Sequence, residues 1–237
     1  MIKQKKIYII IPARGASKGV PKKNIKDFLG KPLLQHTIDY AKESNYVDKI
    51  ILTSDNSEIQ KIGLNNNINV VYRPSEISGD YATTESAIQH IIEQSNFENN
   101  CIFILLQPTS PVRPKNSLDE MITLFNDNKY DSMLTLSPIH PLLWKIDKDN
   151  ATAQYDYKNR PRRQDFDDKD LVYDENGSIY IFTYQIFKKT GNRLGGKIGY
   201  FIFDEKFGKQ IDEPIDFSIL ESIGNYLKEG KKWIKIT

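Results

Sequence analysis

Strand-like apolar runs alternate with amphipathic stretches through the first half of this chain, and this alternation restricts the possible folds more than any other feature. Runs of strand length stand at residues 7–11, 49–53, 69–72, 101–106 and 132–136. Segments with helical periodicity lie between them, at residues 33–43, 58–65, 85–93 and 117–126. A βαβα order of this kind predicts a three-layer α/β domain with helices on both faces of a mostly parallel, Rossmann-like sheet.

The alternation stops after Pro138. Residues 139–172 are rich in charges and show little periodicity. Because long structureless loops are uncommon in compact domains, we predict a small insertion here that folds over the sheet or onto a second subunit, the alternative being a long surface loop. Strands are expected again at 178–182 and 197–203, and an amphipathic helix at 217–228. We therefore expect a single domain over residues 1–237 that contains the insertion.

The composition is that of an ordinary globular protein. A formal net charge of +2 gives no argument for nucleic acid as a partner, and no apolar segment approaches the length of a membrane span. The apolar run after Lys3, Lys5 and Lys6 is too short for the core of a signal peptide. The single cysteine, Cys101, excludes an internal disulfide and a cysteine-rich zinc site. We expect a cytoplasmic protein.

A basic loop follows the first predicted strand. It contains four cations, Arg14, Lys18, Lys22 and Lys23, and no acidic residue precedes Asp27. Loops at the carboxyl ends of strands bind ligands in open α/β sheets, and clustered cations with free backbone N–H groups suit several negative charges held close together, such as a triphosphate. The P-loop pattern G-x-x-x-x-G-K-[ST] is absent, as is a G-x-G-x-x-G after the first strand. The alternative is a solvated basic turn.

Polar residues also follow the later strands, at the same edge of the predicted sheet. Asp55 can contact a ribose or a metal, or else cap the next helix. Arg73 ends the third strand, and Thr84 can cap the following helix or help to bind a base or phosphate there. Two prolines make the segment after the fourth strand rigid, so Gln107 can offer a donor and an acceptor to a polyhydroxylated or amide-bearing substrate, unless the segment is a plain loop.

Two carboxylates stand between the last predicted strand and the last helix. Asp216 lies where the N-cap of that helix is expected, which explains it without a ligand. Asp212 has no such local role. Because Mg²⁺ binds one or two carboxylates together with substrate phosphates, we predict Mg²⁺ as a cofactor and favour Asp212 as its ligand.

Five motifs follow one another in order over nearly the whole chain. They are I-P-A-R-x-x-S-K-x-x-x-x-K-N (Ile11 to Asn24), R-P-x-E (Arg73 to Glu76), Q-P-T-S-P-x-R (Gln107 to Arg113), R-Q followed by N-G-[AS]-I-Y (Arg163-Gln164 and Asn176 to Tyr180), and I-D-x-x-x-D (Ile211 to Asp216). This series resembles the acylneuraminate cytidylyltransferases, also called CMP-sialic acid synthetases. The resemblance implies a nucleotidyltransferase fold and transfer of CMP from CTP to the anomeric hydroxyl of a nine-carbon 2-keto sugar acid, with release of pyrophosphate.

The resemblance also implies roles for single residues. Arg14 and Lys23 would be catalytic, with Lys23 neutralising the charge that builds on the α-phosphate and the leaving group. The nucleotide-binding set would be Arg14, Gly15, Ser17, Lys18, Lys23, Asn24, Arg73 and Thr84. The set that binds the sugar acid would be Gln107, Lys145, Arg163, Asn176 and Tyr180. Asp212 and Asp216 would hold Mg²⁺. The enzyme would be a homodimer in which residues 139–172 build the interface and the partner supplies some site residues.

Two positions depart from the family pattern. Gln210 stands where many relatives have a second aspartate, which leaves less charge at the metal site. Asp174 stands where many sialate enzymes have a non-acidic residue, which counts against N-acetylneuraminate and keeps open a bacterial acid such as legionaminate or pseudaminate. An alternative is 3-deoxy-manno-octulosonate cytidylyltransferase, whose first loop, S-T-R-L-P-G-K-P, is not matched here. Remoter alternatives are a GT-A-like glycosyltransferase, for which a D-x-D motif is missing, and a non-catalytic nucleotide-binding module.

Overall fold

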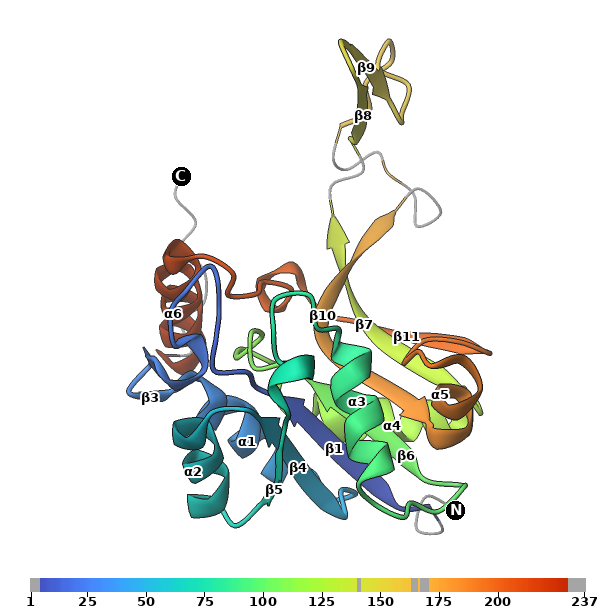
Figure 1. Cartoon of the computed structure of the whole chain (residues 1–237). Coiled ribbons are helices and arrows are strands. Elements are labelled where there is room, and N and C mark those ends of the chain that lie inside the picture. Colours follow the sequence, from blue (N-terminus) through green and yellow to red (C-terminus); the bar gives the residue numbers. More distant parts are fainter. Residues whose placement is uncertain (1–4, 140–141, 163–165, 167–170, 230–237) are drawn as a thin grey trace.

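A seven-stranded sheet forms the centre of the computed structural model, which describes residues 5–139, 142–162, 166 and 171–229 (Figure 1). In spatial order its strands are β11 (Ile198–Ile202), β7 (Ser132–Ile139), β10 (Val172–Thr183), β6 (Ile102–Leu106), β1 (Ile7–Pro12), β4 (Lys49–Ser54) and β5 (Asn69–Tyr72). Strand β10 runs antiparallel to β6 and β7, and the other neighbouring pairs are parallel. The prediction of a mostly parallel sheet is therefore confirmed.

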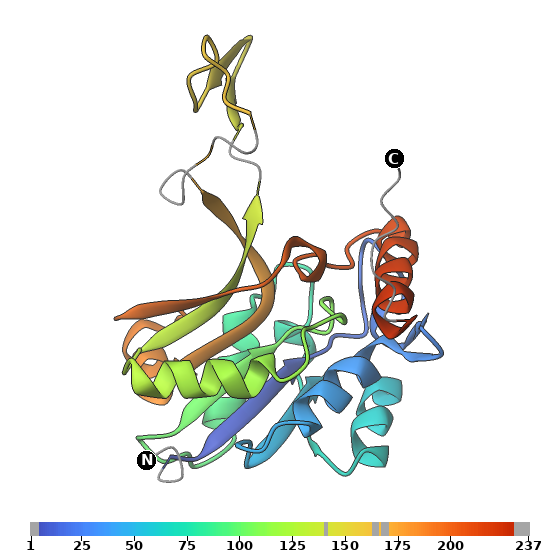
Figure 2. The same ribbon diagram turned by 180° about the vertical axis from the view of Figure 1, so that it is seen from behind.

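Helices cover both faces of this sheet, which confirms the predicted three layers. They are α1 (Leu33–Lys42), α2 (Ser57–Asn65), α3 (Thr84–Glu93), α4 (Ser117–Asp127), α5 (Tyr184–Thr190) and α6 (Pro214–Glu229). On one face Ile38 of α1 and Met121 of α4 pack against Ile104 of β6, and the view from behind shows α4 on this side (Figure 2). On the other face Ile88 of α3 packs with Phe103. Within the described residues no helix is long and apolar enough to cross a membrane.

The order of the strands creates a crevice at the end of β1. Strand β1 pairs with β4 on one side and with β6 on the other, so the chain winds outward from β1 in both directions. The connections that leave the carboxyl ends of these strands therefore separate, which is where open α/β sheets bind ligands. The predicted basic loop leaves β1 at this point.

The segment predicted as an insertion contains a small sheet of its own. Strands β8 (Trp144–Asp147) and β9 (Asn150–Ala153) pair with each other and stand away from the main sheet (Figure 1). Strand β8 is exposed along its whole length and β9 along most of it, which explains why hydrophobic periodicity did not reveal them. Strands β7 and β10, which flank the segment, are longer than predicted.

A separate apolar cluster fixes the basic loop to the end of the chain. Strands β2 (Asp27–Phe28) and β3 (Lys31–Pro32) form a short hairpin, and Phe28 packs there with Phe217 of α6. Val20 of the basic loop and Ile211 are buried in the same cluster. The packing therefore holds the basic loop next to the segment that carries Asp212.

Candidate active site

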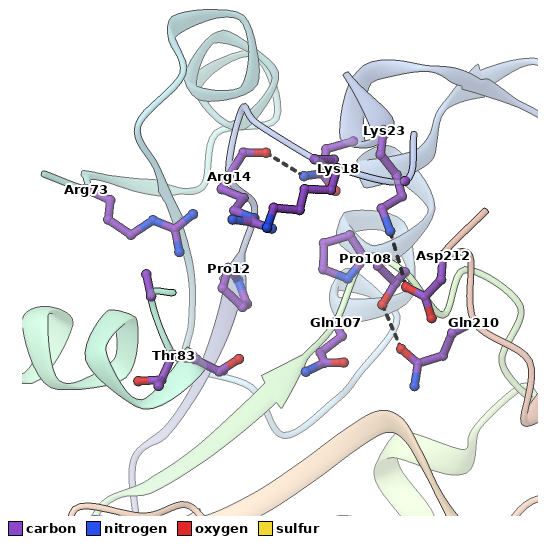
Figure 3. A pocket seen from close by; sticks show the side chains of 16 residues that line it. Pro12, Arg14, Lys18, Lys23, Arg73, Thr83, Gln107, Pro108, Gln210 and Asp212 are labelled. Carbon is purple, nitrogen blue, oxygen red and sulfur yellow. Dashed lines mark hydrogen bonds and ion pairs between the residues drawn. The ribbon is translucent and has the colours of Figure 1, made fainter. Parts of the chain in front are cut away.

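A cleft of about 490 Å³ lies at the carboxyl ends of β1 and β6, a size that suits a nucleotide (Figure 3). Most of the predicted site residues converge on it. The predicted residues that line it are Arg14, Ser17, Lys18, Lys23, Asn24, Arg73, Thr84, Gln107 and Asp212. Thr83, Thr109 and Gln210 line it as well. Thr83 was not predicted, Thr109 stands in the rigid segment that follows Gln107, and Gln210 was considered only as a departure at the metal site.

Carboxylates from other elements neutralise the cations of the basic loop. Asp80 lies 3.1 Å from Nη1 of Arg14 and 3.2 Å from Nζ of Lys18. Lys22 instead pairs with Glu58 of α2 at 3.4 Å and does not line the cleft. Exposed ion pairs of this kind contribute little stability. A phosphate group can therefore take the place of Asp80 at Arg14 and Lys18 at small cost.

Lys23 is held deep in the cleft, beside the predicted metal ligand. Its ammonium donates to the carbonyl of Ile211 at 2.5 Å and lies 3.4 Å from Oδ1 of Asp212. The side chain of Lys23 is 11% exposed, whereas that of Asp212 is 73% exposed. Gly19 touches the same segment, because a β-carbon placed on it would lie 1.9 Å from the backbone oxygen of Asp212. The two loops are thus in direct backbone contact.

Hydrogen bonds set the path of the basic loop. The N–H of Gly15 donates to Asp55 at 2.9 Å, and the amide of buried Asn24 donates to the carbonyl of Arg14, also at 2.9 Å. Asn56, not Asp55, caps α2, so the capping alternative for Asp55 is wrong. Gly15 does not itself line the cleft, and its predicted role in binding nucleotide stays a prediction.

Arg73 brings buried hydrogen-bond donors to the cleft. The residue is only 5% exposed, and neither Nε nor Nη2 meets a hydrogen-bond partner within the described residues. Burial lowers the pKa of its guanidinium, a shift that Asp55 opposes and Arg14 adds to. Buried donors without partners are costly. An oxygen of a bound base or phosphate would remove this cost.

The helix that follows Arg73 presents its first residues to the cleft. Thr83 is the N-cap of α3, since its hydroxyl accepts from the N–H of Ser86 at 3.1 Å. The capping alternative for Thr84 is therefore wrong, because the helix begins one residue earlier than that alternative requires. Thr84 lines the cleft without a capping role.

A buried arginine fixes the segment that carries Gln107. Arg113 donates to the carbonyl of Gln107 at 2.7 Å, to Oγ of Ser178 at 3.0 Å and to Oγ1 of Thr37 at 3.2 Å. Burial lowers the pKa of Arg113 to about 10. Arg113 therefore ties the end of β6 to β10 and to α1, a role that its spacing from Gln107 did not predict.

The structure does not bring Asn176 or Tyr180 into the cleft. The buried amide of Asn176 accepts from Thr135 at 2.5 Å and donates to Ser137 at 2.9 Å, and so holds β10 against β7. The hydroxyl of Tyr180 donates to Glu175 at 2.5 Å. Burial, followed by that hydrogen bond, raises the pKa of Tyr180 to about 12. Both side chains are thus engaged within the sheet.

The other two predicted contacts with the sugar acid are Lys145 and Arg163. Lys145 lies on the exposed strand β8 and does not line the cleft. Arg163 lies outside the described residues. Their roles stay predictions.

The two predicted metal ligands differ in what they do. Asp216 accepts from the N–H groups of Asp212 and Glu213 at 2.8 and 2.7 Å, and these bonds hold the pKa of its carboxyl below the usual range. Asp216 therefore shapes the loop and does not line the cleft. No group of three metal-ligating side chains is found in the part of the chain that the structure describes. Asp212 alone suits Mg²⁺ that is shared with substrate phosphates.

Comparisons with known proteins show the family of this chain. A family model described as Cytidylyltransferase matches residues 8–232. An N-acylneuraminate cytidylyltransferase of Streptococcus agalactiae serotype III is 32% identical over 214 residues, which are 88% of this chain and 51% of that protein. A pseudaminic acid cytidylyltransferase of Campylobacter jejuni is 33% identical over 181 residues, which are 73% of this chain and 77% of that protein. The chain spans about half the length of the N-acylneuraminate relatives that it matches.

Solved structures share the fold. CMP:2-keto-3-deoxy-manno-octonic acid synthetase complexed with CTP superimposes with a TM-score of 0.70 at 15% identity, over 94% of this chain and 100% of that one. A 4-diphosphocytidyl-2C-methyl-D-erythritol synthase gives 0.68 at 12% identity, over 92% and 99% of the two chains. These two likenesses concern the fold alone, whereas the family model covers nearly the whole sequence, and so the chain belongs to the cytidylyltransferase family.

Proposed function

We propose that this chain transfers CMP from CTP to the anomeric hydroxyl of a nine-carbon 2-keto sugar acid and releases pyrophosphate. The observation that carries the proposal is the convergence of Arg14, Lys18 and Lys23 on one cleft with the buried guanidinium of Arg73, whose Nε and Nη2 meet no partner among the described residues. Three of these cations suit a triphosphate, and the buried fourth suits an oxygen of the nucleotide.

The reaction requires mainly that the protein position the two substrates and neutralise the charge on the phosphates. The hydroxyl oxygen forms a bond to the α-phosphorus, the bond from that phosphorus to the bridging oxygen of the β-phosphate breaks, and the hydroxyl proton passes to solvent. Lys23 sits where it can neutralise the charge that builds during this exchange, and its burial strengthens the effect. Arg14 and Lys18 exchange Asp80 for phosphate oxygens.

Mg²⁺ belongs to the proposal as a cofactor, with Asp212 as the protein ligand. The bound ion would supply further neutralisation of the phosphates. The exposed carboxylate of Asp212 fits an ion that enters with the nucleotide. Asp216 takes part by holding the backbone of Asp212 in place.

We include a homodimer in the proposal. The segment that contains β8 and β9 exposes large apolar side chains, with Trp144 49%, Ile146 69% and Tyr157 58% exposed. Exposed apolar groups gathered in one place are typical of an interface. In such a dimer Lys145 would reach the cleft of the partner subunit. Trp144→Ser should then shift the protein toward a monomer in light scattering coupled to size exclusion, and an unchanged mass would count against this interface.

The test of the reaction is pyrophosphate release from CTP and Mg²⁺ with a panel of acids: N-acetylneuraminate, legionaminate, pseudaminate and 3-deoxy-manno-octulosonate. Lys23→Ala should lower turnover by about 10²-fold or more, because one preorganised charge is lost. Lys22→Ala is the matched control, since Lys22 pairs with Glu58 away from the cleft. No release with any acid would refute the proposal, and release with the octulosonate alone would change the acceptor class.

A further inference from the structure

Gln210 lies in the cleft with its two amide ends in different surroundings. Its Oε1 accepts a hydrogen bond from the hydroxyl of Thr109 at 3.1 Å. Its Nε2 lies next to Gly177, because a β-carbon placed on that glycine would be 2.4 Å from this nitrogen. The oxygen end is therefore engaged with the protein, and the donor end faces the region where β10 begins to pair with β6.

Gln107 converges on the same place. The β-carbon position of Gly177 is 3.1 Å from Oε1 of Gln107. Gly177 also has a φ of +67°, so both its conformation and the two amides exclude a side chain there. Figure 3 shows Gln107 and Gln210 close together and apart from Arg73. Two side-chain amides thus meet over a glycine, away from the arginine that we assign to the nucleotide.

The arrangement argues against a metal-binding role for Gln210. An amide binds Mg²⁺ through its oxygen, and here one of the two lone pairs of that oxygen accepts from Thr109. The carboxylate of Asp212, by contrast, is exposed and lies beside Lys23. Among the described residues that line the cleft, Asp212 has the only carboxylate.

We propose that Gln210 is an acceptor-binding residue: its Nε2 donates to an oxygen of the acid substrate, and with Gln107 it determines which acids fit, while Asp212 alone meets the metal. The inference rests on the proposed function. A neutral donor at this place attracts a carboxylate or carbonyl oxygen of the acceptor, whereas a carboxylate in its place would repel an acid.

The test uses Gln210→Glu, which keeps the shape of the side chain and replaces its donor by a charged acceptor. With the acid that the wild type uses best, the KM for that acid should rise by about tenfold or more, since the site loses a hydrogen bond and gains a repulsion. CTP affinity, measured by calorimetry without acceptor, should stay within about twofold of the wild type. Gln210→Ala should raise the same KM by a smaller factor. Gln185→Glu, at an exposed position of α5, is the control for the change in net charge.

Metal binding is read separately, from the electron paramagnetic resonance of Mn²⁺ titrated into protein with α,β-methylene-CTP. The Mn²⁺ concentration at the midpoint of the titration should be the same in Gln210→Glu as in the wild type. A midpoint that shifts by about tenfold, with an unchanged KM for the acid, would place Gln210 at the metal and overturn the inference. A wild type that fails to turn over any acid would refute the proposed function instead, so the two failures are distinguishable.

Discussion

Gly19 is the position at which one added methyl group should disturb the cleft most. A β-carbon there would lie 1.9 Å from the backbone oxygen of Asp212 and 3.2 Å from its carbonyl carbon, whereas ordinary contacts begin near 3.4 Å. Both atoms belong to the backbone and cannot rotate away. Gly19→Ala therefore requires the basic loop and the Asp212 segment to separate by about 1.5 Å.

A separation of this size is large compared with the tolerance of a catalytic site. The hydrogen bond from Lys23 to the carbonyl of Ile211, 2.5 Å long, would break or drag Lys23 out of the cleft. Because a misplacement of about 1 Å can cost 10²-fold in rate, we expect kcat to fall by about 10²-fold. The strain is relieved by movement of the loop, so the melting temperature should fall by less than about 4 °C, which corresponds to roughly 1 kcal/mol for a chain of this size.

The assay is the initial rate of pyrophosphate release together with thermal unfolding. Gly79→Ala is the matched control, because Gly79 accepts from Arg14 at the same cleft, yet a β-carbon on it meets nothing within 4 Å. The control should keep a rate within about threefold of the wild type. If Gly19→Ala also keeps its rate, the contact between the two loops does not position Lys23, and the reasoning fails.

Three further predictions concern single side chains. Arg113→Lys should destabilise the protein by about 1–3 kcal/mol in chemical unfolding, because a lysine cannot reproduce a three-way fork to Gln107, Ser178 and Thr37. The pKa of the Asp216 carboxyl is lower in the folded protein than its usual value. Asp216 should therefore stabilise the protein at pH values above the usual pKa and lose this contribution as the pH falls through the folded pKa. In Asp216→Asn the free energy of unfolding should depend less on pH over this range. Cys101, buried and with its pKa raised to about 12, should not react with a thiol reagent until the protein unfolds.

The sequence predicted the sheet well because its strands carry a local signal. All five residues of β6 are buried, so a continuous apolar run marks the strand without any knowledge of its neighbours. Because the carboxyl ends of parallel strands lie at the same edge of a sheet, the sequence also predicted that Arg14, Arg73 and Gln107 would lie close together.

What the sequence could not predict depends on contacts between distant residues. Asp80 neutralises Arg14 across 66 positions, and Lys23 meets Ile211 across 188. No spacing rule connects such pairs. Hence the four cations of the basic loop were expected to act together, whereas Lys22 pairs with Glu58 and does not line the cleft.

The placement of Tyr180 illustrates a second limit. A family motif fixes which residue stands at a position, but the pleat decides which face its side chain takes. Ile179 and Ile181 enter one apolar cluster and Tyr180 the other. The pairing of β10 with β7 shifts register between Glu175 and Tyr180, and such a shift cannot be inferred from an alternating pattern.

A costly feature of the chain lies at the cleft, and it follows from what the cleft is proposed to bind. Arg73 is buried, and its Nε and Nη2 meet no hydrogen-bond partner among the described residues, while Gly19 lets the basic loop approach Asp212 more closely than a side chain would allow. Buried donors without partners cost free energy. The apolar clusters on both faces of the sheet offset that cost, since they need nothing from the cleft to form. A cost of this kind persists where a ligand relieves it, and a nucleotide oxygen that accepts from Arg73 would recover part of that free energy on binding.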